Sequence, residues 1–240
     1  MESLNERQHT LLTSLIREYV LTATPVASQA LVGKRGLDVS PATIRNELLE
    51  LEQAGYLEQP YTSAGRIPSQ AAWRLYVDEL LTNLEDTAEP VHPAVEQLQT
   101  ALDASRRDPD RLVRVFAKQL AEVFDEAVIV GLSRQDVYYT GLSHLFSQPE
   151  FSEVRSVVAI SALVDRLDEL VGDLYDTARD RIDVLLGRDN PLGDSCSLLV
   201  TQYVLPRHEP GMMAVLGPVR QDYANHLPLL RYATQLLKTV

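Results

Sequence analysis

The stretch SPATIRNELLELEQAGY, residues 40–56, decides the fold of the first part of the chain. Ser40 is a favourable helix N-cap, Pro41 suits the first helical position, and Gly55 marks the end of the helix. Apolar residues recur at helical spacing and predict one buried face: Ile44, Leu48 and Leu51. The other positions begin small and polar and end with three acids: Glu47, Glu50 and Glu52. This polarity is typical of a recognition helix whose leading end enters the major groove of DNA while its acidic end stays away from the phosphates.

Two further helices are predicted before this one. Residues 11–20 place apolar side chains at helical spacing and form the first helix. Thr24 and Pro25 interrupt that pattern, and Pro25 predicts the start of a short second helix that Gly36 closes. Helices in this order form a helix-turn-helix.

A hairpin is predicted directly after the recognition helix. Residues 56–60 and 66–69 are short extended segments, and the small residues between them form a tip that contains Gly65. A hairpin in this position is the wing of a winged helix-turn-helix. A helix over residues 70–84 follows, and its broad apolar surface indicates burial against a neighbouring domain or subunit.

Candidate DNA contacts follow from this arrangement. They lie on the recognition helix, in the wing and just before the helix: Ser40, Ala42, Thr43, Arg45, Asn46, Thr62, Ser63, Arg66, Lys34 and Arg35. Hydroxyl and cationic groups bind phosphate, whereas the leading residues of the helix reach base edges. Taken alone, the polar helix face also fits an ordinary solvated surface, and Arg45 also fits an ion pair with Glu52 or Glu79.

The charge balance is unusual for a DNA-binding protein. The net charge is −12, and residues 1–80 hold 7 Lys and Arg against 10 Asp and Glu. A DNA-binding domain is expected to be basic. DNA binding must therefore depend on where the few cations lie, and non-specific affinity for DNA should be weak.

The remaining chain is predicted to form a second domain. Residues 85–93 contain prolines and acids and form the linker, so the predicted domains are residues 1–84 and 94–240. Helices are predicted at 95–104, 111–123, 155–178 and 223–239, and strands at 127–132, 137–140, 182–186, 197–205 and 212–216. This pattern predicts an α+β domain with a largely antiparallel sheet of about five strands and helices packed on one side.

Several segments resemble the HrcA family of heat-inducible transcription repressors. In the first domain they are residues 24–28, 40–47 with 51–52, and 59–68; in the second they are residues 147–151, 216–223 and, more loosely, 187–190. The chain departs from the family at Tyr61, where His is usual, and at Val219 and Gln221, where Thr and Met are usual. Family members are also typically longer, and the missing residues are expected between Asp110 and Tyr138.

The resemblance implies a homodimer that binds an inverted-repeat operator in double-stranded DNA before chaperone operons and blocks their transcription. It also implies a GAF-like second domain and a chaperonin as modulator, which keeps the repressor active. Heat would relieve repression by loosening the second domain or the dimer. The region missing from this chain would include the inserted dimerisation region of the family.

Two other functions stay open. The GAF-like domain could sense a small molecule and make the chain a metabolite-responsive regulator, or the winged helix could serve as an interaction module that does not bind DNA. For residues 187–190 and 217–223, turn chemistry explains the glycines and prolines. The alternative is a pocket rim or subunit contact.

An enzyme is not expected, because the sequence shows no catalytic constellation and no nucleotide-binding loop. No cofactor and no metal site are expected either, since the five histidines are scattered and Cys196 is the only cysteine. No apolar run approaches the roughly 18 residues that span a bilayer, and no signal peptide is recognised. We therefore expect a cytoplasmic protein, associated with the nucleoid, without a membrane partner.

Overall fold

The computed structural model describes residues 4–34, 36–37, 39–85, 93–105, 108–151, 167–191, 193, 195–205 and 209–239. The chain divides into two compact units, Met1–Glu79 and Leu80–Val240. The division falls inside helix α3 (Gln70–Asn83), slightly before the predicted boundary at residue 84. Most of the predicted linker, residues 86–92, lies outside the described residues. Among the described helices, none is both long enough and apolar enough to cross a membrane.

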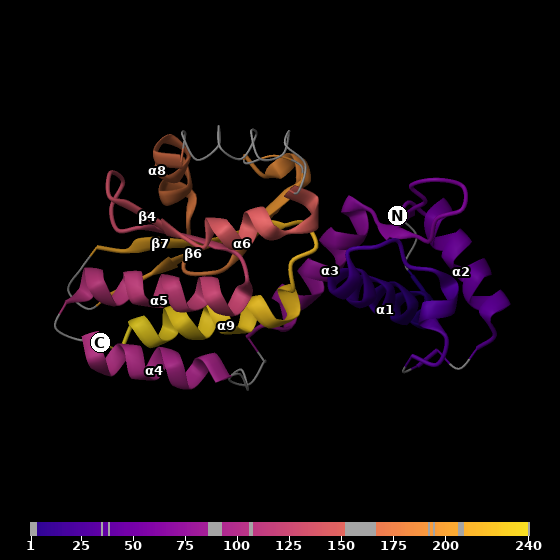
Figure 1. Cartoon of the computed structure of the whole chain (residues 1–240), viewed down its shortest axis with the longest axis horizontal. Coiled ribbons are helices and arrows are strands. Elements are labelled where there is room, and N and C mark those ends of the chain that lie inside the picture. Colours follow the sequence, from indigo (N-terminus) through magenta and orange to yellow (C-terminus); the bar gives the residue numbers. More distant parts are fainter. Residues whose placement is uncertain are drawn as a thin grey trace. The chain divides into compact units, whose positions relative to one another are not determined.

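The first unit begins with α1 (Glu6–Thr22), drawn in indigo in Figure 1. Asn5 caps this helix, because its side chain accepts a hydrogen bond from the backbone N–H of Gln8 at 2.9 Å. The Gln8 side chain accepts one from the Asn5 backbone at 3.2 Å, which completes a capping box. The apolar stripe is buried as predicted: Leu11, Leu12, Leu15 and Ile16.

The segment after α1 differs from the prediction. The short second helix predicted from Pro25 begins later, at Ser28, as the 3-10 helix η1 (Ser28–Leu31), and Val26 before it forms a β-bridge. Val26 pairs with Arg66 through two backbone hydrogen bonds of 2.8 Å, one in each direction. This pairing joins residues far apart in the sequence, so local pattern could not reveal it. It gives the wing a third extended segment.

The recognition helix and the wing follow as predicted. The helix is α2 (Pro41–Gln53), and the wing consists of β1 (Leu57–Glu58) and β2 (Ile67–Pro68). The two strands are antiparallel, with Leu57 opposite Pro68 and Glu58 opposite Ile67. The strands are shorter than the predicted extended segments.

Helix α3 closes the first unit against α1. Its inner face is buried: Ala72, Trp73, Tyr76 and Val77. The Tyr19 and Trp73 rings lie 6.3 Å apart between centroids. Nε2 of His9 lies 2.6 and 2.8 Å from the two carboxylate oxygens of Glu79, which adds a polar tie between the two helices.

The second unit is built on a five-stranded sheet in the order β4-β3-β7-β6-β5, with antiparallel pairing throughout. Its strands are β3 (Ala127–Gly131), β4 (Val137–Thr140), β5 (Asp183–Leu186), β6 (Cys196–Tyr203) and β7 (Gly211–Pro218). All five lie within a few residues of their predicted positions. The predicted α+β class and antiparallel sheet are therefore confirmed.

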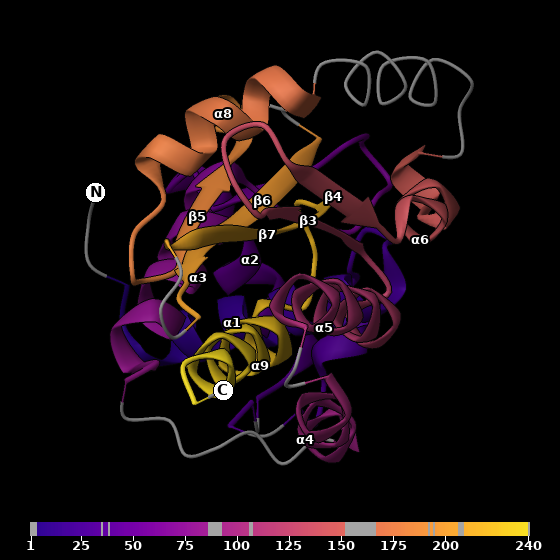
Figure 2. The same ribbon diagram turned by 90° about the vertical axis from the view of Figure 1, so that its left-hand side faces the viewer.

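Helices cover both faces of this sheet. Helices α5 (Pro109–Phe124) and α9 (Tyr223–Leu237) lie on one face, with α4 (Pro93–Ser105) packed outside them in Figure 2. Helices α6 (Leu142–Ser147) and α8 (Leu167–Thr177) lie on the other face in Figure 1. Two 3-10 helices, η2 (Pro149–Phe151) and η3 (Gly187–Asp189), complete the unit.

The prediction of helices on one side only is wrong, and the central strand explains why. Every residue of β7 is buried, so both of its faces need cover. Alternate strand residues such as Ile129 and Ala214 pack with Leu145 of α6 and Val171 of α8. Of the helix predicted over residues 155–178, the part before Leu167 lies outside the described residues.

Candidate nucleic-acid interface

The start of α2 is fixed by a side-chain cap, as predicted. The Ser40 hydroxyl accepts a hydrogen bond from the backbone N–H of Thr43 at 3.1 Å and lies 2.9 Å from the Thr43 hydroxyl. Pro41 occupies the first turn, where a missing N–H costs no hydrogen bond. The hydroxyls of Ser40 and Thr43 therefore bond to each other and set the start of the helix.

One face of α2 presents the residues predicted to read bases. Ala42, Arg45 and Asn46 are exposed, and Thr43 is half-buried. The opposite face is buried as predicted: Ile44, Leu48 and Leu51. Leu49, which the sequence did not single out, is 47% exposed and adds an apolar group to the outer surface.

Arg45 is free of the ion pairs that were considered for it. Glu52 pairs with Arg66, and Glu79 pairs with His9. Within the described residues, the Arg45 guanidinium has no ion-pair partner. It is therefore available to an external anion.

Glu47 corrects the predicted pattern of α2. It was expected on the outside or flank of the helix, but it is buried and forms an ion pair with Arg7 of α1. The reason is its position three residues after Ile44, which places it on the inner side of the helix. Its Oε2 atom has no hydrogen-bond partner in the part of the chain that the structure describes.

The other two acids of α2 are also engaged by side chains from elsewhere. Nε2 of Gln8 donates a hydrogen bond to Glu50 at 3.0 Å. Nε and Nη2 of Arg66 lie 2.9 and 2.8 Å from Oε2 of Glu52. Each acid of the helix thus has a partner within the first unit, and the cations that pair with Glu47 and Glu52 lower the repulsion of these two acids for an approaching polyanion.

The wing has an ordered tip. Nε2 of Gln59 donates hydrogen bonds of 3.0 Å to the carbonyl oxygens of Thr62 and Ala64. Gly65 lies directly against the backbone of Val26, where a Cβ atom would be only 2.4 Å from the Val26 carbonyl group. A side chain at this position would push the wing off the bridge, which explains the glycine.

Two of the three cations predicted to bind phosphate, Arg66 and Lys34, are already paired. The Arg66 side chain is only 18% exposed and is held by Glu52. Nζ of Lys34 lies 2.8 Å from Glu18. Arg35 lies outside the described residues. The structure therefore gives Arg66 the position of a tie between wing and recognition helix rather than of a free phosphate ligand.

The wing tip also displays a residue that the sequence reasoning missed. Tyr61 is 62% exposed, and the neighbouring Thr62 and Ser63 are exposed as predicted. Residues 59–66 contain no acid, in a chain whose net charge is −12. An aromatic residue in a predicted turn without acids was the sequence signal that could have marked Tyr61 as a candidate contact.

In the second unit, the family-like segments of residues 147–151 and 216–223 contact each other. Arg220 donates to the Glu150 carboxylate from Nε at 2.5 Å and to Oε1 of Gln148 from Nη2 at 2.9 Å. A Cβ atom on Gly217 would lie 2.5 Å from the carboxyl carbon of Glu126. Burial raises the pKa of Glu126 from 4.5 to about 9, although the Arg220 guanidinium acts to lower it. These contacts favour a packing role for both segments.

Gln221, one of the departures from the family pattern, belongs to a buried hydrogen-bonded group. Its Nε2 donates to the Ser197 hydroxyl at 2.5 Å, and its Oε1 lies 3.1 Å from Nδ1 of His226. Burial lowers the pKa of His226 to about 4, so the ring is neutral at pH 7. Burial also raises the pKa of the Cys196 thiol, to about 12. Among the described residues, no group of three His, Cys, Asp or Glu could hold a metal ion.

The chain is similar to known transcription repressors over nearly its whole length. The family described as HrcA protein C terminal domain matches residues 76–227. The heat-inducible transcription repressor HrcA of Desulforudis audaxviator is 29% identical and aligns over 99% of this chain and 98% of its own length. That of Symbiobacterium thermophilum is 26% identical over 95% and 96%.

The alignment to the Desulforudis audaxviator protein spans 336 positions. This chain has 240 residues, so at least 96 of those positions are gaps in it. The expectation that relatives are longer is confirmed, and the site of the shortfall stays a prediction. A crystal structure of a hypothetical protein at 2.2 Å resolution superposes with a TM-score of 0.81, covers 99% of this chain and 98% of its own, and is 18% identical. At that identity the likeness concerns the fold.

Proposed function

The chain belongs to the HrcA family of transcription repressors, and we propose that it represses heat-shock chaperone operons by binding an inverted-repeat operator as a homodimer. Repression follows from occlusion of the promoter by the bound repressor. Such a repressor acts in the cytoplasm, at the nucleoid. A chaperonin modulates the repressor in this proposal, because the chain belongs to this family.

One observation carries the proposal. The acids of α2 are all bonded inside the first unit, whereas Arg45 and Asn46 stand exposed beside each other on the leading half of the helix. This arrangement supports the proposal despite the negative net charge. A helix with a free cation and a free amide at its leading end can approach base edges in the major groove.

Each contact residue has a distinct proposed role. Asn46 has the amide group that pairs with adenine in the major groove, and Arg45 has the fork that pairs with guanine or phosphate. Ala42 allows close approach and offers a methyl contact. Thr62 and Ser63 donate hydrogen bonds to phosphate from the wing.

The remaining predicted residues support these contacts from inside the unit. Ser40 and Thr43 hold the start of α2, while Arg66 holds the wing against the helix. Phosphate binding by Lys34 and Arg35 is proposed as a smaller contribution. Lys34 is paired with Glu18. In this proposal the exposed residues contact DNA, and Ser40, Thr43 and Arg66 orient them.

The proposal is tested with the whole chain and genomic DNA fragments. DNA retained by the purified protein is sequenced, and the recovered fragments should share a palindrome. The half-site centres should lie about 34–36 Å apart or at a multiple of that distance, because a two-fold dimer places two recognition helices in major grooves on one side of the duplex. The mass of the complex should equal two chains per operator. Recovery of random fragments, or of a complex with one chain, would contradict the proposal.

A further inference from the structure

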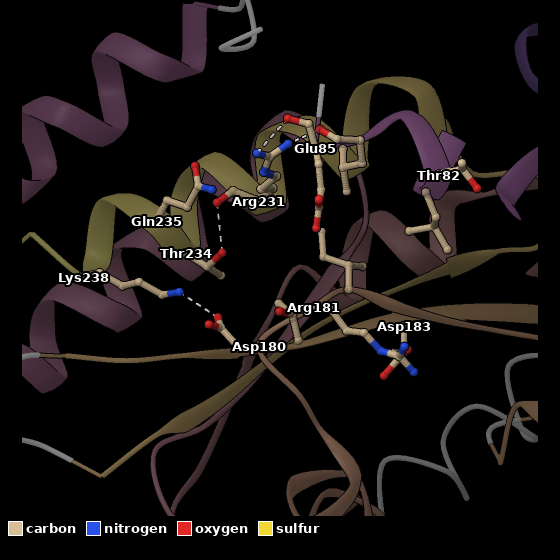
Figure 3. Close-up of a pocket in the computed structure, with 13 residues that line it drawn as sticks. Thr82, Glu85, Asp180, Arg181, Asp183, Arg231, Thr234, Gln235 and Lys238 are labelled. Atoms are coloured by element: carbon tan, nitrogen blue, oxygen red, sulfur yellow. Dashed lines mark hydrogen bonds and ion pairs between the residues drawn. The ribbon is translucent and has the colours of Figure 1, made fainter. Parts of the chain in front are cut away.

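A cavity of about 770 Å³ lies within the second unit, between the end of α3, the helix α9 and the strands β5 and β6, as Figure 3 shows. This volume falls in the range of small-molecule sites, about 300–1,000 Å³. Its apolar wall is formed by three side chains: Leu81, Leu84 and Ile182.

The charged residues of the cavity fall into two classes. Lys238 is bonded to Asp180 at 2.7 Å, and Nε of Arg181 lies 3.0 Å from Asp183. These two pairs are neutral as units. Neither pair offers a net charge to a ligand.

Arg231 and Glu85 form the second class. The Arg231 guanidinium donates to the backbone carbonyl oxygens of Leu84 and Glu85, the latter at 3.3 Å, so its partners are neutral. Within the described residues, the Glu85 carboxylate has no ion-pair partner. The cavity therefore presents one cation and one anion that are not neutralised by an opposite charge.

We propose that this cavity binds a small zwitterion, an amino acid or a short peptide, with its carboxylate at Arg231, its ammonium group at Glu85 and its apolar body along Leu81, Leu84 and Ile182. A carboxylate can bind a guanidinium through two parallel hydrogen bonds and adds the attraction of opposite charges, which a neutral carbonyl oxygen does not supply. A ligand carboxylate would thus replace the two backbone carbonyls at the guanidinium. The ammonium group would neutralise Glu85 at the same time.

Occupation of the cavity bears on DNA binding, and this step rests on the proposed function. Leu84 and Glu85 follow directly after α3, the helix that begins at Gln70 in the first unit. Arg231 holds their carbonyl oxygens, which a helix end leaves without intrahelical partners. A ligand that takes the donors of Arg231 releases the end of α3, so ligand and operator affinities should be coupled.

Calorimetry with the full chain and no DNA tests the site itself. The probes are L-leucine and L-leucyl-L-leucine, which distinguish an amino acid from a short peptide. Binding of at least one of them is expected, with affinity reduced about tenfold or more when the amine is acetylated or the carboxylate is amidated. Absence of binding by both probes, or equal binding of the blocked forms, overturns the proposal.

Variants locate the bound zwitterion. Arg231→Lys keeps a positive charge but loses the guanidinium fork, and Glu85→Gln removes the negative charge; each should weaken binding about tenfold. Arg111→Gln, at an exposed position on α5 outside the cavity, is the matched control and should bind as the parent chain does. Circular dichroism shows that each variant is folded. Unchanged binding by folded Arg231→Lys and Glu85→Gln overturns the assignment.

A separate measurement examines the coupling. The dipeptide or amino acid that binds is added to the operator complex, and the operator affinity should shift several-fold. An operator affinity that does not respond to a ligand already shown to bind overturns the coupling. A chain that binds the zwitterion but no operator would instead refute the proposed function, so the two failures are distinct.

Discussion

The recognition helix and the segment of residues 216–223 both carry family resemblance, yet the structure places their charges in opposite ways. On α2, Arg45 and Asn46 face outward, and the acids are bonded within the first unit. In the second unit, Arg220 is bonded to Glu150 and Gln148, and Gly217 lies against buried Glu126. The difference teaches that one family segment can leave its charged group exposed while another pairs its own within the fold, and only the partners of those groups distinguish the two.

The largest effect on stability is expected at Glu126, on the packing side of the comparison. Its pKa in the folded state is about 9, above its ordinary value of 4.5. Between these two pH values the Glu126 carboxyl is protonated in the folded state and ionised in the unfolded state. The stabilising contribution is complete below about pH 4.5 and is lost as pH rises toward about 9. Glu126→Gln removes this dependence, and its advantage over the parent chain should grow with pH to on the order of a few kcal/mol.

Urea unfolding followed by far-ultraviolet circular dichroism at several pH values measures this effect. Trp73 is the single tryptophan and lies in the first unit, so its fluorescence provides an internal control that should not change. If the free energy of unfolding changes with pH in the same way for Glu126→Gln and the parent chain, the Glu126 carboxyl is not buried and protonated.

His226 should affect stability in the opposite direction. Its pKa is lowered from 6.5 to about 4, so its contribution to the free energy of unfolding is lost as pH falls through that range.

The next largest effect is expected on the stability of the first unit, when Glu47 of the recognition helix loses its ion pair with Arg7. Arg7→Met leaves the buried Glu47 carboxylate without its cation, which should cost the first unit about 1–3 kcal/mol. Arg17→Met, at an exposed position of the same helix, is the matched control. Trp73 fluorescence during urea unfolding reports the change. Equal unfolding midpoints for the two variants would show that Glu47 does not depend on Arg7.

Arg66 sharpens the comparison from the side of the wing. Arg66 is already paired with Glu52, so Arg66→Ala should leave the salt dependence of operator binding nearly unchanged. The variant should still weaken operator affinity several-fold, because the wing is held less firmly against the helix. Anisotropy titrations at several salt concentrations measure both quantities. A salt slope reduced by about one counter-ion would show instead that Arg66 neutralises a phosphate.

The smallest effect is expected at Tyr61. Tyr61→Phe removes only the hydroxyl, and its effect on operator affinity should stay below that of Tyr61→Ala, which also removes the exposed ring. Neither variant should alter the salt slope, since the side chain carries no charge. Operator affinities equal to that of the parent chain for both variants would place the wing tip outside the interface.

Local signals predicted much of this molecule. Ser40 and Pro41 gave the start of α2, apolar spacing gave its buried face, and the strands of the second unit were placed within a few residues. The failures depend on tertiary partners. Val26 pairs with Arg66 far along the chain, and Glu47 is buried because Arg7 meets it there. The continuous apolar run of β7 is the local signal for a sheet covered on both faces.

For the candidate site, the sequence located the helix and the wing but not which cations are free. Arg45 and Arg66 look alike in sequence, and the two differ only because Glu52 reaches one of them. Lys34 is engaged by Glu18 in the same manner. An ion pair between residues on different elements leaves no local pattern, so this part of the site required the structure.

Operator affinity of Asn46→Ala, measured beside Gln53→Ala, tests the central claim most directly. Both residues are exposed on α2, one on its leading half and one at its end. Asn46→Ala should lose roughly 1–3 kcal/mol of specific operator binding, while Gln53→Ala binds as the parent chain does and both keep their unfolding midpoints. If folded Asn46→Ala binds the operator as tightly as the parent chain, α2 does not read DNA through this face.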